Sequence, residues 1–313
     1  MLTQFLNALP NTVTQGILWG IMAIGVYITY KILNIADMTV DGSIVTGMAV
    51  CAVLMTAGWN VWPAMLVATL AGMLAGLVTA VFHTLMGIPA ILSGILTQLM
   101  LWSINLKIMG SANVSVSART FKVLLTQMFK AKSLLLMIPF ALVLVGLLYW
   151  FFGTELGRAF RATGCNPDMS RAQGINTRGM TILGLVLSNG IVALSGALLC
   201  QFQGYADVNS GRGAIVIGLA AIIIGEALFS RIARNFAVRL LTVIAGGIIY
   251  YLVYQTVIFL GLDADLLKML SAIVVAVFLS VPYWQSKLRR GRRQTFNPAK
   301  PQDPIDEEVE KDA

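Results

Sequence analysis

The residues of this sequence that could do chemistry are polar side chains embedded in otherwise apolar stretches. Two stretches stand out: residues 36–49 read A-D-M-T-V-D-G-S-I-V-T-G-M-A, and residues 206–220 read A-D-V-N-S-G-R-G-A-I-V-I-G-L-A. Polar groups within membrane spans usually face a bundle interior or a water-filled path. We therefore expect a solute path lined by these groups and the glycines beside them: Asn34, Asp37, Asp41, Gly42, Ser43, Asp207, Arg212 and Gly213.

The two stretches also resemble each other. With one gap, seven positions agree, among them Asp37 with Asp207 and Gly42 with Gly213. In the assignment of membrane spans given below, the two copies are five spans apart. An odd number of spans between them means that they run in opposite directions across the membrane, as the inverted repeats of many transporters do. Two short helices would then start near the midplane, where a positive helix N-terminus suits a carboxylate. Asp37 and Asp207 could instead be ordinary N-caps, and chance similarity between apolar segments is a further alternative.

Motifs for covalent chemistry do not occur in the sequence. No Gly-Lys dipeptide is present, which excludes the G-x-x-x-x-G-K-[ST] phosphate loop, and neither H-E-x-x-H nor G-x-S-x-G is found. His83 has no ligand partner at suitable spacing, and Cys51, Cys165 and Cys200 show no paired spacing. We expect no enzymatic activity, no metal and no cofactor in this chain. Energy for active transport must then come from a partner or an ion gradient.

Composition defines the class of protein that must position these residues. Apolar residues make up 58% of the 313-residue chain, charged residues 12%, and the mean hydropathy is +0.81. A soluble domain has about a quarter charged residues, so this chain could not keep a soluble surface hydrated. The net charge of +8 lies in short interruptions between apolar runs, which argues against a nucleic-acid-binding face. The sequence predicts an all-α, multispanning membrane protein.

A membrane-spanning helix needs about 20 apolar residues. We predict nine spans in a transmembrane domain of residues 1–284, followed by a charged cytoplasmic tail, 285–313. The two runs that begin at Gly42 and Gly213 are short and could be re-entrant. The nine runs are 14–33, 42–58, 62–86, 89–109, 133–152, 180–203, 213–229, 237–260 and 265–284.

Basic residues predict the orientation. The loop 153–179, with four arginines, and the basic tail are expected in the cytoplasm, which puts the N-terminus outside. Four basic residues between residues 119 and 132 oppose this assignment. We expect the segment 121–130, F-K-V-L-L-T-Q-M-F-K, to lie on the membrane surface as an amphipathic helix. Glu226 is expected to pair with Arg231 at the cytoplasmic edge.

Small residues predict where helices approach closely. They recur at four-residue spacing in the third run: Ala68, Gly72, Gly76 and Ala80. At Gly42 and Gly213 we also expect glycine to be needed for close packing.

The loop 153–179 contains a predicted short helix. Asn166 is a suitable cap, Pro167 fits the first helical position, and Gly174 is a suitable end. A capped cytoplasmic helix between two spans could dock in a groove of a soluble subunit. An ordinary connecting loop is the alternative.

Several motifs resemble one known family. G-R-A-x-R-A-x-G-x-N-P-x-x-x-R-x-x-G-I-N from Gly157 and S-N-G-I-V-A-L-S-G-A-L from Ser188 resemble the permease subunit of ABC importers in the branched-chain amino acid and ribose class. M-T-V-D-G-S from Met38 and L-W-S-I-N-L-K-I-M-G from Leu101 are similar to an uncharacterised branch, some members of which are linked to tryptophan or tyrosine uptake.

The resemblance implies a type II ABC importer-like fold and a set of partners. These are an ABC ATPase subunit that holds ATP and Mg, a periplasmic or lipid-anchored substrate-binding protein, and a second permease copy. It places residues 41–43 and 212–214 at the inner ends of the path. The family's ATPase-coupling helix maps onto residues 166–175, and the residues implied are Arg161, Gly164, Asn166, Pro167, Arg171, Gly174 and Ile175.

We therefore expect the permease subunit of an ATP-driven importer in the bacterial inner membrane, working by alternating access. The expected solute is a small organic molecule, an amino acid, with aromatic amino acids as one candidate group. A stand-alone ion-coupled carrier is the alternative, since an inverted repeat suits it equally well. The sequence does not identify the substrate.

Overall fold

The computed structural model describes residues 2–117, 121, 123–128, 130–229 and 235–259, with isolated positions between 269 and 280. The predicted ninth span, 265–284, falls almost wholly outside the described residues. The predicted tail, 285–313, lies outside them entirely. The statements below concern the described part of the chain.

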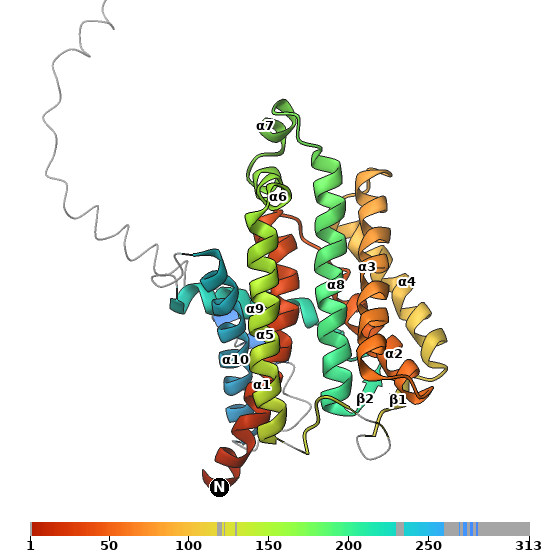
Figure 1. Cartoon of the computed structure of the whole chain (residues 1–313), viewed down its shortest axis with the longest axis vertical. Coiled ribbons are helices and arrows are strands. Elements are labelled where there is room, and N and C mark those ends of the chain that lie inside the picture. The colour runs from red at the N-terminus through yellow and green to blue at the C-terminus, as the bar shows by residue number, and fades with distance from the viewer. Residues whose placement is uncertain are drawn as a thin grey trace, which may run out of the picture.

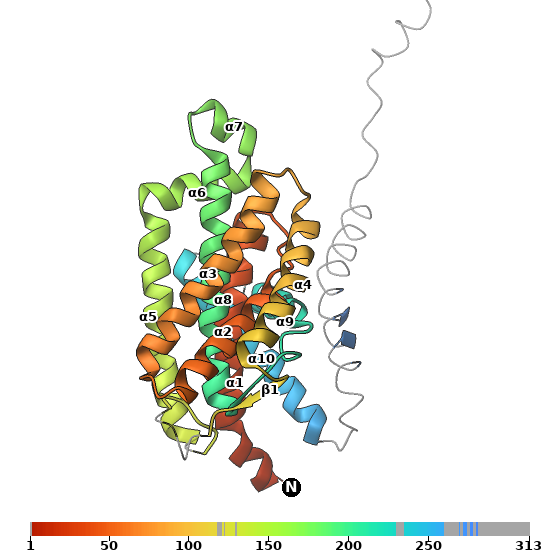
Figure 2. The same ribbon diagram turned by 90° about the vertical axis from the view of Figure 1, so that its right-hand side faces the viewer.

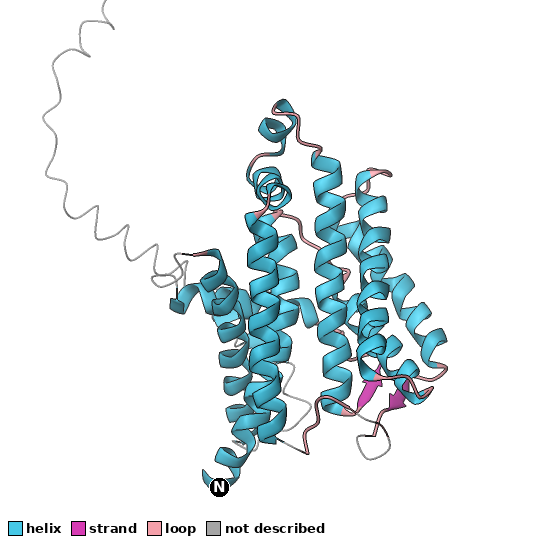
Figure 3. Ribbon diagram, viewed as in Figure 1, coloured by secondary structure: helices cyan, strands magenta, loops and turns pink. Residues whose placement is uncertain are grey.

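Most of the described chain is helical, as the sequence predicts (Figure 3). Its two strands, β1 and β2, form an antiparallel ribbon that pairs Asn113 with Asp207. The elements, in chain order, are α1 (Leu2–Tyr27), the π-helical turn η1 (Ile28–Ile32), α2 (Val40–Thr56), α3 (Val61–Thr84), α4 (Ala90–Met109), β1 (Asn113–Ser115), α5 (Lys130–Gly153), α6 (Glu155–Cys165), α7 (Pro167–Ala172), α8 (Thr177–Gln203), β2 (Tyr205–Asp207), α9 (Ala214–Phe229) and α10 (Phe236–Phe259).

Six helices are long and apolar enough to cross a membrane: α1 with η1, α3, α4, α5, α8 and α10. Two further apolar helices, α2 and α9, have only 17 and 16 residues. Each of the eight predicted runs before residue 261 therefore corresponds to a helix, and the two short runs are the two short helices. The chain is a multi-pass membrane protein. The count of nine spans stays a prediction.

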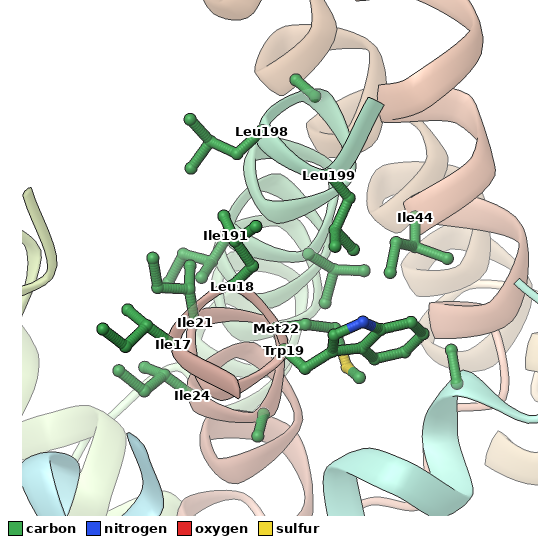
Figure 4. Close-up of a cluster of buried hydrophobic side chains, with 14 of the residues drawn as sticks. Ile17, Leu18, Trp19, Ile21, Met22, Ile24, Ile44, Ile191, Leu198 and Leu199 are labelled. Atoms are coloured by element: carbon green, nitrogen blue, oxygen red, sulfur yellow. The ribbon is translucent and has the colours of Figure 1, made fainter. Parts of the chain in front are cut away.

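The core is built around α8, the helix at the centre of Figure 1. Helix α1 packs along it, and Figure 4 shows Leu18 and Ile21 of α1 beside Ile191 of α8. Two serines of α8 donate hydrogen bonds to α1 carbonyls, Ser188 to Gly25 and Ser195 to Leu18, each at 2.7 Å. Hydroxyl groups that bond across helices in this way satisfy themselves where water is absent.

Close packing of α3 against α8 confirms the prediction from its small residues. Ala68, Gly72, Gly76 and Ala80 are all buried. A Cβ atom on Gly72 would collide with the carbonyl oxygen of Asn189, and one on Gly76 with that of Leu185.

The predicted amphipathic helix at 121–130 is wrong for the described residues, which are irregular from Phe121 to Met128. This segment bonds to the protein instead. The Leu124 amide donates to the Gln201 side chain at 3.2 Å, and the Leu125 side chain is fully buried. The Thr126 amide likewise donates to the Ser133 hydroxyl at 3.1 Å, so these two amides find partners outside a helix.

The two ends of the bundle differ. Helix α7 projects beyond one end, where α6 also lies, whereas the β1–β2 ribbon lies at the other end (Figures 1 and 2). Helix α8 joins these ends, because it begins just after α7 and ends just before β2. With 27 residues it is about 40 Å long at 1.5 Å per residue.

Candidate functional site

The start of α2 is held by a buried network of polar side chains. Asp37 accepts a hydrogen bond from the Thr39 amide at 2.9 Å and one from the Asn189 side chain at 2.7 Å. Ser43 donates to the Asn189 amide oxygen at 2.6 Å. Asp37, Ser43 and Asn189 are all at most 3% exposed. Asn189, on α8, therefore joins the turn before α2 to the first turn of that helix.

Asp37 is not the N-cap that the sequence analysis offered as an alternative. The cap position belongs to Thr39, and Asp37 binds the amide two residues ahead of itself. Asp207 does the same, since its carboxylate accepts from the Asn209 amide at 2.7 Å. The two matched aspartates thus form the same local turn. However, Asp207 lies in strand β2, seven residues before α9 begins.

The start of α9 is capped by a carboxylate from the other short helix. Asp41 of α2 accepts hydrogen bonds from the Gly213 and Ile215 amides, both at 2.9 Å. The first amides of a helix have no partner within it, and a negative charge there is favourable. Asp41 supplies the acceptor oxygens and the negative charge, so the N-terminus of α9 rests on the first turn of α2. The sequence analysis placed Asp41 on the path but did not identify it as this cap.

The two predicted glycines serve different purposes, which corrects the expectation that both pack closely. Gly42 lies against α4, where an added Cβ would approach Leu101 to 2.8 Å. Gly213 has open space around its Cα but a φ of +85°. Only glycine adopts that conformation without strain. Gly213 is needed for backbone conformation, because its amide must turn toward Asp41.

Two cavities adjoin beside the start of α9. Their volumes are about 450 and 340 Å³, and both are lined by Trp19, Ser210, Arg212 and Tyr254. The larger one also reaches Gln203, Tyr205 and Asp207, and the smaller one Gly213 and Tyr250. A third cavity of about 180 Å³ lies between Asp41, Gly42, Gln98, Asn105 and Arg212, among others. Arg212 lines all three.

Among the described residues, three polar atoms at these cavities are buried without a hydrogen-bond partner: Asn105 Oδ1 at the third cavity, and Trp19 Nε1 and Gln203 Oε1 at the two larger ones. The sequence analysis named neither Trp19 nor Gln203, nor Tyr254. Trp19 and Tyr254 lie within long apolar helices, where aromatic residues are most often packing residues. Of these three residues, Gln203 is the one with an amide side chain at the end of an apolar run. As the last residue of α8, it points to no particular function in the sequence.

Asn34 lies apart from the other predicted path residues. It is exposed, has a φ of +57°, and lines a cavity of about 400 Å³ with His83, Gly164, Arg171 and other residues near α6 and α7. Asparagine tolerates this left-handed conformation better than most residues. The structure therefore gives Asn34 a place in the turn after η1, at the end of the bundle opposite β2.

The predicted short helix in the loop 153–179 is confirmed as α7. Asn166 accepts a hydrogen bond from the Met169 amide at 3.0 Å, and Pro167 occupies the first helical position. Gly174 follows the helix with a φ of +83°. Arg171 donates to Thr177 at 2.9 Å, which ties α7 to the first residue of α8. Most of α7 is exposed, including Met169 at 59%, whereas Ile175 is half-buried.

Two of the residues assigned by resemblance brace α6 from within the chain. Arg161 donates to the Phe152 carbonyl at 3.1 Å, and its guanidinium lies 5.6 Å from the centre of the Phe236 ring. Gly164 fits against the carbonyl of Ile32, where any Cβ would collide. Both residues hold α6 against the ends of α5, α10 and η1.

Glu226 forms an ion pair, but with a different partner from the one expected. Its carboxylate lies 2.9 Å from Lys31 Nζ, and both side chains are partly exposed. The expected partner, Arg231, lies outside the described residues.

Comparison with known proteins gives the family. The family model described as the permease component of branched-chain amino acid transport systems matches residues 8–279. The chain is 40% identical over 275 residues to a tyrosine transport system permease protein of Clostridioides difficile, a match that covers 88% of this chain and 91% of the relative. It is 34% identical over 278 residues to an uncharacterized protein of Rickettsia prowazekii, covering 88% and 98%.

A more distant relative is the autoinducer 2 import system permease protein LsrC of Salmonella typhi, 30% identical over 210 residues, which are 66% of this chain and 58% of the relative. No solved structure matches the chain significantly. The family match extends over most of the sequence and includes every residue of the two helix starts and of α7. The chain is thus a member of the family of permease components of branched-chain amino acid transport systems.

Proposed function

We propose that the chain is the membrane-spanning subunit of an ATP-driven importer for an amino acid, with aromatic amino acids as the favoured substrates. The observation that carries this proposal is the meeting of two short helix starts inside the bundle, with cavities beside them. Discontinuous helices whose ends meet near the midplane are typical of substrate sites in transporters. The tyrosine transport permease among the relatives supports an aromatic substrate.

Helices α2 and α9 are the corresponding elements of an inverted repeat in this proposal. Support comes from the matched aspartate turns at Asp37 and Asp207 and from the contact of the α9 N-terminus with the first turn of α2. Two halves of opposite direction can rock about a shared site and expose it to each side in turn.

Energy enters this system through α7. We assign α7 as the docking helix for an ABC ATPase subunit, which binds the ATP and Mg. Its exposed Met169 is flanked by Asp168 and Arg171, which gives an apolar contact with a polar rim. A substrate-binding protein delivers the solute on the opposite side of the bacterial inner membrane, and a second permease copy completes the assembly.

Helix α8 provides a physical link between the two ends. Its first residue, Thr177, is bonded to Arg171 of α7, and its last residue, Gln203, lines the larger cavity. Between them, Asn189 holds the start of α2. A displacement of α7 is therefore transmitted along one rigid helix to both the network and the cavity, which is the two-ended coupling that alternating access requires.

Co-purification tests the proposal. The tagged full chain is extracted in mild detergent and its partners are identified by mass spectrometry, in the wild type and in a Met169→Glu variant. We expect a stoichiometric phosphate-loop ATPase with the wild type and its loss with the variant, because a charge would enter the apolar contact. Ala112→Glu, on an exposed residue just before β1 at the opposite end of the bundle, is the control and should retain the ATPase.

A homo-oligomer without any ATPase, also after mild cross-linking in the membrane, would refute the proposal. That result would favour the ion-coupled carrier.

A further inference from the structure

The two cavities beside the start of α9 can be treated as one space, because they share Trp19, Ser210, Arg212 and Tyr254. Volumes of about 450 and 340 Å³ lie in the range of sites for small organic ligands, about 300–1,000 Å³. The space lies near the end of the bundle opposite α7, beside the last residue of α8 and strand β2. A solute would therefore reach it from the side on which the binding protein is expected.

Two donor groups, Arg212 and Trp19 Nε1, line both cavities. The Arg212 guanidinium makes no hydrogen bond or ion pair within the described part of the chain. Trp19 is 7% exposed, and its Nε1 has no acceptor. A buried donor without a partner costs about 1–3 kcal/mol, so an acceptor from a ligand would relieve that cost. A guanidinium and an N–H group together suit a carboxylate.

Acceptor groups line the larger cavity. Gln203 Oε1 is buried without a donor, and the Asp207 carboxylate also faces this space. The Asn209 amide takes one lone pair of Asp207, and the Asn113 side chain makes a long contact of 3.5 Å with the other oxygen. A carboxylate offers about four acceptor positions, so it can take a further bond from an ammonium group.

Aromatic side chains form the remaining wall. Trp19 stacks on Tyr251 with ring centres 5.9 Å apart, and Tyr251 meets Tyr254 at 5.9 Å. Tyr205 also lines the larger cavity and is 41% exposed. Aromatic walls favour a planar ring, because edge-to-face and offset contacts contribute beyond simple burial.

We infer that this space is the substrate site and that it binds an α-amino acid with an aromatic side chain. Arg212 and Trp19 Nε1 bind the carboxylate, Gln203 Oε1 and Asp207 bind the ammonium group, and Trp19 and Tyr254 contact the ring. This inference rests on the proposed function, since it supplies the solute that such a permease would carry. Asp41 holds the α9 N-terminus beside the site and already accepts the hydrogen bond of the Gly213 amide. This amide therefore does not compete with Arg212 for the carboxylate of the substrate.

Binding to the isolated full chain in lipid nanodiscs tests the site without ATP or any partner. Radiolabelled L-tyrosine is the probe, and competition is measured with compounds that each lack one recognised group. Tyramine lacks the carboxylate, 3-(4-hydroxyphenyl)propionate lacks the ammonium group, and L-leucine lacks the ring. We expect each to bind at least about tenfold more weakly than L-tyrosine, as the loss of one charged or aromatic contact implies.

Variants assign the groups. Arg212→Gln should weaken L-tyrosine about tenfold or more but leave tyramine unchanged, because tyramine has no carboxylate to lose. Asp207→Asn should weaken L-tyrosine and leave 3-(4-hydroxyphenyl)propionate unchanged. Trp19→Phe keeps the aromatic face and removes only the N–H donor, with an expected loss of about threefold to tenfold. Arg178→Gln, at the opposite end of the molecule, is the matched control.

Three results would overturn the inference. These are no binding of L-tyrosine, L-phenylalanine or L-tryptophan at millimolar concentration, equal binding of L-leucine, or an equal response of L-tyrosine and tyramine to Arg212→Gln. Each variant is first compared with the wild type by thermal unfolding in detergent. If L-tyrosine does not bind, the substrate site is refuted, and the co-purification still decides whether transport is driven by ATP. If uptake occurs without an ATPase, the proposed function is refuted, and the binding results still decide the site.

Discussion

The starts of α2 and α9 carry similar sequences but are built differently. At α2, the side chains of Asp37, Ser43 and Asn189 bond to one another and are buried. At α9, the cap comes from Asp41 of the other helix, and the neighbouring Trp19 Nε1 and Gln203 Oε1 have no partner. The buried side chains at the α2 start bond to one another, although Asn105 Oδ1 beside Gly42 is also buried without a partner in the described part of the chain. The α9 start has two such atoms, and both face the larger cavity. In the proposed inverted repeat, one copy would then provide rigidity and the other would provide the binding site.

The largest effect is expected from breaking the closed start. Asn189→Leu keeps the side-chain size but leaves Asp37 and Ser43 buried without their partner. Each unsatisfied buried group costs about 1–3 kcal/mol, and more when it is charged, so we expect a loss of at least about 3 kcal/mol. Thermal unfolding in detergent and the yield of folded protein measure it.

Asn176 provides the control on the same helix. It caps the start of α8 from an exposed position, where its side chain accepts from the Gly179 amide at 3.0 Å. Asn176→Ala should cost about 1 kcal/mol, as the loss of a cap does. If the two variants were equally stable, the buried network would have no special role.

The next effect concerns the joint between the two starts. Asp41→Asn keeps the shape but leaves only one carbonyl oxygen for the Gly213 and Ile215 amides and removes the charge at the helix N-terminus. We expect a loss of about 1–2 kcal/mol in stability. The loss of substrate uptake should be stronger, because Gly213 and Arg212 would be displaced together.

Uptake in proteoliposomes, corrected for the amount of folded protein, measures this second effect. Asp168→Asn, whose side chain is 89% exposed on α7, is the control for stability and should change it by less than about 0.5 kcal/mol. Normal uptake by Asp41→Asn would show that the joint is not needed for transport.

A smaller effect separates the two glycines. Gly213→Ala should cost about 1 kcal/mol through its positive φ, and Gly213→Asn should recover part of that cost, because asparagine tolerates the left-handed region. At Gly42 the order should reverse. Asparagine is larger than alanine, so Gly42→Asn should be worse than Gly42→Ala against Leu101 of α4. The same order at both positions, measured by thermal unfolding, would contradict the distinction.

The smallest effect is expected at the ion pair of Lys31 and Glu226, which joins η1 to the last turns of α9. Both side chains are about half or less exposed. Such pairs contribute about 0–1 kcal/mol, and salt screens them. Lys31→Met should therefore lower stability slightly in low salt and not at all in high salt. A loss as large as that of Asn189→Leu would mean that the far end of α9 is held as tightly as the start of α2.

The sequence predicts the local features of this molecule well. Apolar runs give eight of the ten α-helices described before residue 261, small residues give the contact of α3 with α8, and Asn166 with Pro167 gives the start of α7. Each of these depends on residues that are close together in the chain. The family, which rests on several local motifs, was predicted for the same reason and is confirmed.

Contacts between distant segments could not be predicted. Asp41 and Gly213 are 172 positions apart, and nothing in either segment shows that one caps the other. Strands β1 and β2 pair segments that are far apart in the chain. Asp207, which the sequence placed near a helix start, therefore lies in a strand. Trp19 and Tyr254 look like packing residues in apolar helices, and their proposed role in substrate binding rests on the cavity that both line.

Energy coupling is the central claim of this account, and uptake by the complete complex tests it most directly. The chain, its co-purified ATPase and the binding protein are reconstituted in liposomes, and accumulation of labelled L-tyrosine is measured with ATP, with a non-hydrolysable analogue, and with imposed proton or sodium gradients. We expect L-tyrosine to accumulate with ATP alone, and this accumulation to be lost in Met169→Glu. Accumulation driven by an ion gradient without ATP would contradict it.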